Sequence, residues 1–262
     1  ITAAAAGQTI TLIDDVNEGV VTFNKNLTLD GADNTFKGGI YLNKANGYFT
    51  IKNVNFDNDD NEDVIYAIKS TSSVTQLNVE NCTCVDYTWG FIHANKAVAN
   101  LNVKDVTVNG ITYGVHSVYG TNITLDNYKA IDTDYALMVQ NHGSRNVTLN
   151  NCTFEGCEKP IHVWERNQTN KISFTFTGDN VSDTEMPTGD MYGYTGKETN
   201  VTIAKNVAKI GDKGYKSLAE ALENASGLKN VGPASFFFEI GQTELSAKEL
   251  KHLDFYLANV LP

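Results

Sequence analysis

Short stretches of alternating apolar and polar residues recur along most of the chain. Their apolar positions are mainly Leu, Ile, Val or Phe, their polar positions are mainly Asn or Thr, and the alternation stops at an Asn, Asp or Gly. Such alternation is typical of a β-strand with one buried face, and Asn, Asp and Gly commonly open the following turn. Five full copies lie at 49–56, 77–84, 101–108, 123–130 and 147–154, with weaker copies at 27–31 and 174–178.

The spacing of these copies predicts a parallel β-helix. Measured at the Asn, Asp or Gly, successive steps are 22, 28, 24, 22, 24 and 27 residues. One turn of a β-helix has this length when it holds two or three short strands, and a second apolar segment follows in five of the repeats. Leucine-rich repeats have a similar period, but each unit needs several leucines and a helix or its equivalent, which this sequence lacks. The second segments lie at 67–69, 90–92, 114–116, 136–138 and 160–162.

The residue that ends each full copy forms a column of its own. It is Asn at 53, 81, 127 and 151, and Asp at 105. Asn tolerates left-handed backbone angles, and its amide can both donate and accept a hydrogen bond. Stacked turns would bring each Asn next to its equivalent one coil away, so we expect a structural ladder of hydrogen bonds here.

With these repeats, the chain resembles the right-handed parallel β-helix of the pectate-lyase-like superfamily. It is more closely similar to the β-helical repeat regions of prokaryotic adhesin-like cell-surface proteins, over roughly residues 8 to 203. The resemblance implies an all-β solenoid and a non-enzymatic extracellular module at the cell surface. Its implied partners are a glycan or a host or cell-surface ligand. The superfamily also contains glycoside hydrolases and lyases, so a polysaccharide-active enzyme is the alternative.

The end of the chain has a different pattern. We therefore expect a parallel β-helix over 1–203 and a small α/β region over 204–262, which either caps the solenoid or begins the next repeat module. Ser217 and Glu220 form a capping box that predicts a helix over 217–225, and a strand and a second helix are expected at 236–240 and 246–260. In surface proteins of this kind such a helix precedes a strand similar to 7–16, whereas here the helix comes near the end of the sequence and the strand at its start. That order favours one unit of a longer array, with neighbouring repeat modules as partners.

Composition excludes several classes of function. Acidic residues outnumber basic ones 31 to 20, for a net charge of −11, and this field repels phosphate backbones and anionic lipid. We therefore expect no nucleic-acid partner. The sequence has no apolar run of the roughly 20 residues that a membrane-spanning helix needs, so no membrane insertion is expected. No basic segment typical of a signal peptide is visible at the start.

The four cysteines do not form an obvious disulfide or zinc pattern. Cys82 and Cys152 lie in one column but three coils apart, about 14 Å at the usual strand spacing, which is too far for a disulfide. Cys82 and Cys84 also pair poorly, while Cys152 and Cys157 leave a cross-turn pair open. Reduced, buried thiols are the favoured interpretation.

Aligning the second segments at their small residue or proline predicts which side chains face outward. Phe91 and Val115 then share an inward column, His93 also points inward as a core histidine, and His116 and Trp164 point outward. An exposed aromatic ring beside hydrogen-bonding groups is a common way to hold a sugar. The alternative is an ordinary polar surface, with a loop over the tryptophan. The candidate ligand-binding residues are His116, Gln140, His142, His162, Trp164 and Arg166.

Acidic residues gather at the turns that lead into these segments. Asp134 and Glu158 hold equivalent positions in adjacent coils, where their carboxyl groups would lie about 5 Å apart, as in retaining glycoside hydrolases. They are the candidate catalytic pair, although acidic residues are also frequent in ordinary turns. The motifs of pectate lyases and polygalacturonases are incomplete here: of the latter only Asp132-Thr133-Asp134 and His142-Gly143 are found.

The longest repeat contains an acidic loop from Asp57 to Asp63. Its dense oxygen ligands could hold Ca²⁺, but the spacing is not that of an EF-hand, and a solvated loop is the alternative. No other cofactor is expected.

Overall fold

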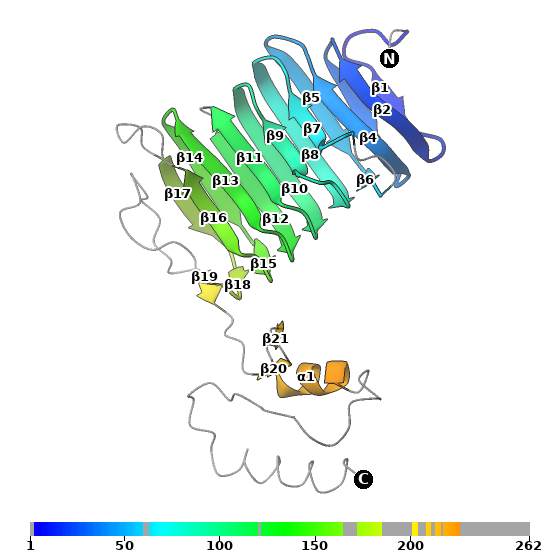
Figure 1. Ribbon diagram of the computed structural model, residues 1–262. Helices are drawn as coiled ribbons and strands as arrows, with labels where there is room; N and C mark the ends of the chain where they lie inside the picture. Colours follow the sequence, from blue (N-terminus) through cyan, green and yellow to red (C-terminus); the bar gives the residue numbers. More distant parts are fainter. Residues whose placement is uncertain are drawn as a thin grey trace, which may run out of the picture. The chain divides into compact units, whose positions relative to one another are not determined.

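The chain forms a parallel β-solenoid (Figure 1). This computed structural model describes residues 3–59, 63–119, 122–164, 172–184, 201–203, 208–210, 213–215 and 217–225. The chain divides into two units, Ile1–Ala204 and Lys205–Pro262, and the solenoid belongs to the first. The predicted stack of parallel coils is confirmed.

The strands pair in three parallel rows, and the longest strands contribute to two of them. The first row joins β1 (Thr9–Thr11), β3 (Leu27–Asp30), β5 (Gly47–Lys52), the first halves of β8 (Val74–Val85), β10 (Val98–Asn109) and β12 (Asn122–Ile131), then β14 (Arg145–Asn150) and β17 (Ile172–Thr177). The second row joins β2 (Val16–Phe23), the start of β4 (Thr35–Leu42), β6 (Asn55–Asp57), the second halves of β8, β10 and β12, and β15 (Thr153–Glu155), β18 (Asn180–Ser182) and β19 (Val201–Ile203). The third row joins the ends of β2 and β4 to β7 (Tyr66–Ser70), β9 (Gly90–Ala94), β11 (Tyr113–Tyr119), β13 (Tyr135–His142) and β16 (Lys159–Trp164).

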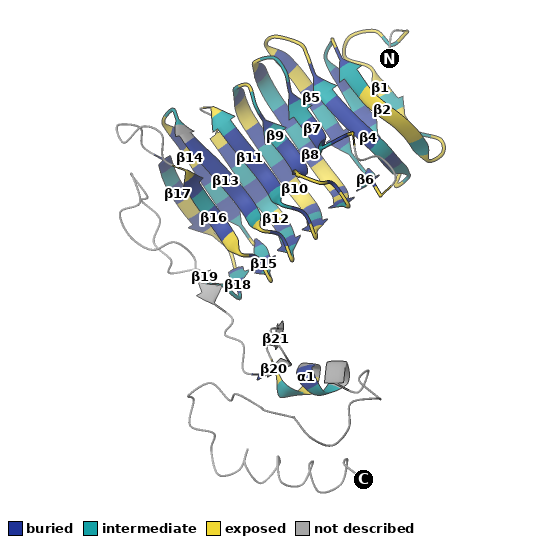
Figure 2. Cartoon of the chain, in the orientation of Figure 1, coloured by how far each residue is buried: buried dark blue, intermediate teal, exposed yellow. Residues whose placement is uncertain are grey.

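Apolar columns fill the space between the rows. In every strand of the first row, the alternation found in the sequence directs one set of side chains into the core and the other to the surface (Figure 2). In the third row one core column is aliphatic throughout. Its members, in register from coil to coil, are Ile40, Ile68, Ile92, Val115, Leu137 and Ile161.

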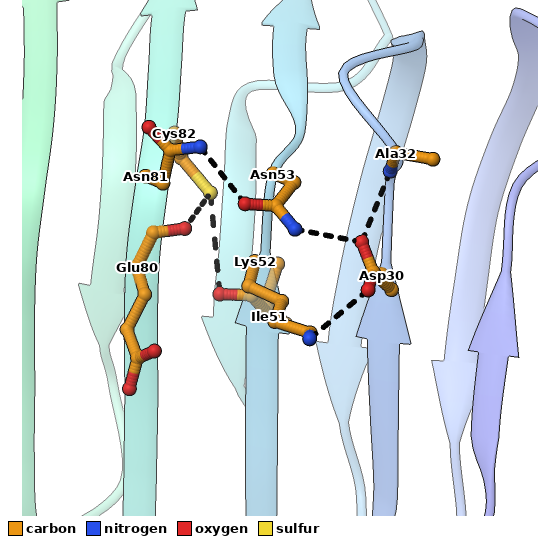
Figure 3. A network of polar contacts seen from close by, with 8 residues as sticks. All are labelled: Asp30, Ala32, Ile51, Lys52, Asn53, Glu80, Asn81 and Cys82. Atoms are coloured by element: carbon orange, nitrogen blue, oxygen red, sulfur yellow. Dashed lines mark hydrogen bonds and ion pairs between the residues drawn. The ribbon is translucent and has the colours of Figure 1, made fainter.

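The predicted ladder of turn residues is confirmed. Asn53 and Asn81 have φ of 53° and 50°, in the left-handed region that Asn tolerates, and Asp105, Asn127, Asn151 and Gly178 repeat this geometry. Asn81 Nδ2 donates to Asn53 Oδ1 at 2.8 Å, and Asn53 Nδ2 donates to Asp30 Oδ1 at 2.8 Å (Figure 3). The hydrogen bond from Asn53, and then the contact with Lys52, lowers the pKa of Asp30 below its usual value.

The cysteine prediction is also confirmed: all four thiols are free and buried. Burial raises the pKa of Cys82, Cys152 and Cys157 to about 12, so these side chains are protonated members of the core.

The predicted alignment of the third row is wrong at one strand. β9 pairs Ile92 with Val115 and His93 with His116, so His93 lies in the His116 column and does not point inward as expected. The reason is an extra residue. Three positions separate Gly110, which has positive φ, from Tyr113, but four separate the equivalent Asp86 from Gly90, which pairs with Tyr113. Aligning the small residues Gly90 and Gly114 therefore shifted this coil by one position.

The second unit contains an antiparallel hairpin of β20 (Ala208–Ile210) and β21 (Lys213–Tyr215), followed by helix α1 (Leu218–Ala225). The predicted helix is thus confirmed and begins directly after Ser217. Ala208 and Ala221 are buried together against Leu218. The elements expected at 236–240 and 246–260 lie outside the described residues. Within the described part of the chain, no helix has the length and apolar character needed to cross a membrane.

The ladder leads to a stability prediction. Replacing Asn53 by Ala removes its hydrogen bonds and places at positive φ a residue without the polar side chain that lets Asn tolerate this region, so we expect a loss of about 1–3 kcal/mol in the free energy of unfolding. Asn53→Gly loses the same hydrogen bonds but tolerates the backbone angle, so it should cost less. Urea denaturation of both variants, with exposed Asn17→Ala as the control, measures this. Equal losses for Ala and Gly would show that the backbone angle contributes nothing.

Candidate functional site

Aromatic and imidazole rings form a continuous series along the third row. Ring centroids lie 6.0 Å apart from Trp89 to Tyr66, 4.4 Å from Tyr66 to His93, and 4.7 Å from His93 to His116. The series continues from His116 to Tyr113 at 4.8 Å, and then through Tyr135 to His162 in two steps of 5.3 Å. These seven residues, referred to below as the aromatic row, come from β7, β9, β11, β13, β16 and the turn before β9.

His116 is the centre of this row and is bonded on both sides. Its Nε2 lies 2.8 Å from Gln140 Nε2, and its Nδ1 lies 3.2 Å from the Tyr66 hydroxyl. Because an amide nitrogen can only donate, His116 Nε2 accepts and Nδ1 carries the proton that is donated to Tyr66. Burial lowers the pKa of His116 to about 4, which agrees with a neutral ring held in one tautomer.

The contact between Tyr66 and His116 crosses a whole strand, because β9 lies between β7 and β11. Gly90 occupies the position between Tyr66 and Tyr113 in the register. A β-carbon at Gly90 would lie 2.0 Å from the Tyr113 carbonyl oxygen, so no other residue fits there without a shift. The close approach of β9 to β11 therefore requires glycine at this position.

His93 is stacked between Tyr66 and His116. Burial, then the nearby His116 and Lys69, lowers the pKa of His93 to about 3. Its Nδ1 is buried and has no hydrogen-bond partner among the described residues. The ring is therefore neutral at pH 7 and is packed between the rings of Tyr66 and His116.

Arg145 supports the same region from β14. Its side chain is only 4% exposed, and it donates to Ser117 Oγ at 2.7 Å, Gln140 O at 2.7 Å and Gly143 O at 3.3 Å. No carboxylate in the described part of the chain forms an ion pair with it, and burial lowers its pKa to about 10. The guanidinium holds the backbone around Gln140 and, through it, His116.

The predicted ligand-binding residues divide into buried and accessible ones. His116 and Gln140 are 7% and 6% exposed and bond to each other, so they position their neighbours and do not present a surface. His162 packs on Tyr135, and His142 lies 5.4 Å from Tyr119, both at intermediate burial. Trp164, in register with Gln140, is 42% exposed. Arg166 lies outside the described residues.

The predicted acidic pair is only partly brought together. Asp134 and Glu158 do lie in adjacent coils, since Lys159 N donates to Asp134 O at 2.7 Å. Asp134 lines a cavity of about 320 Å³ with Asp86 and Asp132 as its other acidic residues, whereas Glu158 does not line it. Glu158 instead lies 3.7 Å from Lys159 in an exposed ion pair.

The sequence did contain a sign of the aromatic row. Tyr66, Tyr113 and Tyr135 each stand directly before the small residue that opens the second apolar segment. An aromatic residue at this position in successive coils predicts stacked rings. The predicted site contains the outward histidines and their polar neighbours, and it includes neither these tyrosines nor Arg145.

No group of three or more His, Cys, Asp or Glu side chains in the described residues is arranged to hold a metal ion. The acidic loop from Asp57 to Asp63 is described only in part, because residues 60–62 lie outside the described ranges. No protein-family model, curated protein or solved structure matches this chain.

The buried histidines lead to a pH prediction. An unfolded histidine binds a proton near pH 6.5, whereas folded His116 does so only near pH 4, so the unfolded state takes up more protons between these values. The contribution of His116 to the free energy of unfolding is therefore fully present above pH 6.5. It falls by up to about 3 kcal/mol as the pH is lowered toward 4. His93 contributes in the same direction.

Denaturant unfolding at pH 7.5, 6.0 and 4.5 measures this effect. His116→Gln should be less stable than wild type at pH 7.5 but should lose less on acidification, because its side chain takes up no proton. Parallel pH profiles for the two proteins would contradict the assignment of a neutral buried His116.

Proposed function

We propose that this chain is a non-enzymatic, glycan-binding module of an adhesin-like cell-surface protein. The observation that carries the proposal is the aromatic row together with the accessible aromatic side chains beside it. Trp164 and Tyr119 are 42% and 41% exposed on the third row, and His142 and His162 lie next to aromatic rings there. Aromatic faces stack on the apolar face of a sugar ring, and adjacent polar groups bond its hydroxyls.

The rigidity of this surface also supports the proposal. The exposed rings rest on a base in which His116, Gln140 and Arg145 are buried and hydrogen-bonded. A site built on strands loses little conformational entropy when a ligand binds, so weak stacking contacts retain more of their energy. Repetition along the solenoid suits an extended glycan, which several coils contact at once.

An extracellular, cell-surface location and contact with neighbouring repeat modules belong to the same proposal. They rest on the resemblance of the repeats to surface proteins. Contact with neighbouring modules also agrees with the general behaviour of solenoids, whose ends are commonly covered by a further unit.

The test is a polysaccharide panel scored for retention of the protein. We expect binding to at least one glycan and a loss of about tenfold in affinity for Trp164→Ala, since aromatic stacking contributes about 0.5–1.5 kcal/mol beyond the burial of the ring. Ile13→Ala is the matched control, because Ile13 is 98% exposed and lies in a different part of the solenoid. Absence of retention on every glycan would favour a purely structural spacer and contradict the proposal.

The cavity at the turns favours a second candidate, a polysaccharide-active enzyme. In that case Asp134, in the cavity with Asp86 and Asp132, would act as acid or base on a bound chain.

Release of reducing ends or unsaturated products from the same panel, with and without calcium, tests this candidate. Asp134→Asn should lower such turnover by at least a hundredfold, while the exposed Asp14→Asn leaves it unchanged. Full activity in Asp134→Asn would contradict a role for this carboxylate, and absence of any product would leave the binding module as the function.

A further inference from the structure

A separate groove lies on the first row of strands, between β3, β5 and β8. Its volume is about 300 Å³. Its polar and aromatic lining comes from three successive coils in register: Asn26, Thr28, Tyr48, Thr50, Gln76 and Asn78. None of these residues belongs to the aromatic row or to the acidic cavity.

Tyr48 provides an aromatic surface at this groove. It is 53% exposed, whereas the next residue, Phe49, is buried in the core and anchors the strand. In the coils on either side, the same column holds Asn26 and Gln76. A single exposed phenol thus lies between amide side chains. In this combination the ring can stack on the face of a sugar while the amides form hydrogen bonds with its hydroxyls.

Internal hydrogen bonds hold the polar groups in place. Asn26 Oδ1 accepts from Tyr48 N at 3.1 Å, which orients the amide next to the ring. On the other side, Gln76 Nε2 donates to Asn78 Oδ1 at 3.0 Å, and Asn102 Nδ2 donates to the same oxygen at 2.9 Å. Both amides flanking the ring are therefore fixed before any ligand arrives.

These bonds leave donors and acceptors unused. The Asn26 Nδ2, the Thr28 hydroxyl, the Tyr48 hydroxyl and the Gln76 Oε1 have no hydrogen-bond partner among the described residues. The set mixes donors and acceptors, and a sugar hydroxyl can do both, so one hydroxyl can satisfy an amide and a threonine together.

The charge of the groove restricts the ligand further. No charged side chain lines it, and the chain as a whole carries a net charge of −11. An acidic saccharide would be repelled and would find no cation to bind. We infer that this groove binds an uncharged oligosaccharide, with Tyr48 stacked on one sugar ring and Asn26, Thr28 and Gln76 bonded to its hydroxyls.

This site goes beyond the proposed function, since it would exist whether or not the third row binds a glycan. If both sites bind, one module contacts its target on two sides of the solenoid, which strengthens attachment to a polymer through effective concentration.

Isothermal titration with uncharged hexasaccharides tests the inference. The probes are β-1,4-linked hexamers of glucose, mannose and xylose, with hexagalacturonate as the charged counterpart, each up to millimolar concentration. We expect at least one uncharged hexamer to bind and hexagalacturonate to bind at least tenfold more weakly at this site. Tyr48→Ala should weaken binding tenfold or more, and Tyr48→Phe should retain it within about threefold because the ring remains.

The controls separate this site from the aromatic row. Trp164→Ala should leave binding at the groove unchanged, and Asn122→Ala, in the same column two coils beyond Gln76, should also have no effect. Since Tyr48 is exposed, its variants should unfold at the wild-type temperature. Binding that is lost in Trp164→Ala but kept in Tyr48→Ala would overturn the groove and support the aromatic row instead. No binding of any uncharged hexamer, or stronger binding of hexagalacturonate, would also overturn it.

Discussion

The parallel pairing of strands from coil to coil is the constraint on which the rest of this structure depends. It brings equivalent side chains of successive coils to the strand spacing of about 4.8 Å, so every chemical type that recurs in the sequence becomes a column in space. That spacing suits stacked rings, and the contacts between His93 and His116 at 4.7 Å and between Tyr113 and Tyr135 at 5.3 Å follow from it. It also suits amide hydrogen bonds, as between Asn81 and Asn53 at 2.8 Å. A change of register in one coil therefore changes the chemistry of a whole face.

This dependence explains what the sequence predicts well and what it does not. The inward columns and the turn ladder follow from local rules, namely the alternation of apolar residues and the tolerance of Asn for positive φ. The position of His93 does not, because it depends on one extra residue between Asp86 and β9 that no local rule detects. The burial of His116 is harder still to predict. It requires a phenol fifty positions earlier in the sequence, Tyr66, to reach across the intervening strand β9.

The candidate site shows the same limit. The described residues predicted for the site, including Trp164, do lie along one row of strands, but the sequence pattern does not separate buried side chains from those that meet solvent. Gln140 and His116 bond to each other, and Arg145, from the next strand of a different row, holds the backbone beneath them. Such support comes from side chains that share no sequence pattern with the residues they hold. It can be found only once the rows are placed against each other.

Charge distinguishes the aromatic row from the groove at Tyr48. Burial keeps His93 and His116 neutral at pH 7, but the charged Arg145 lies beside His116 and Gln140, and Lys159 Nζ lies 5.5 Å from the Tyr135 ring centroid. The groove at Tyr48 has no charged lining at all. The acidic side chains instead gather at the turns, as at Asp86, Asp132 and Asp134. Only the groove thus keeps its aromatic side chain away from charged groups, and ligands there would be selected by the ring face and hydroxyl positions rather than by ionic attraction. This separation of charge from the Tyr48 ring is the physical reason to favour an uncharged glycan over an acidic one at the groove.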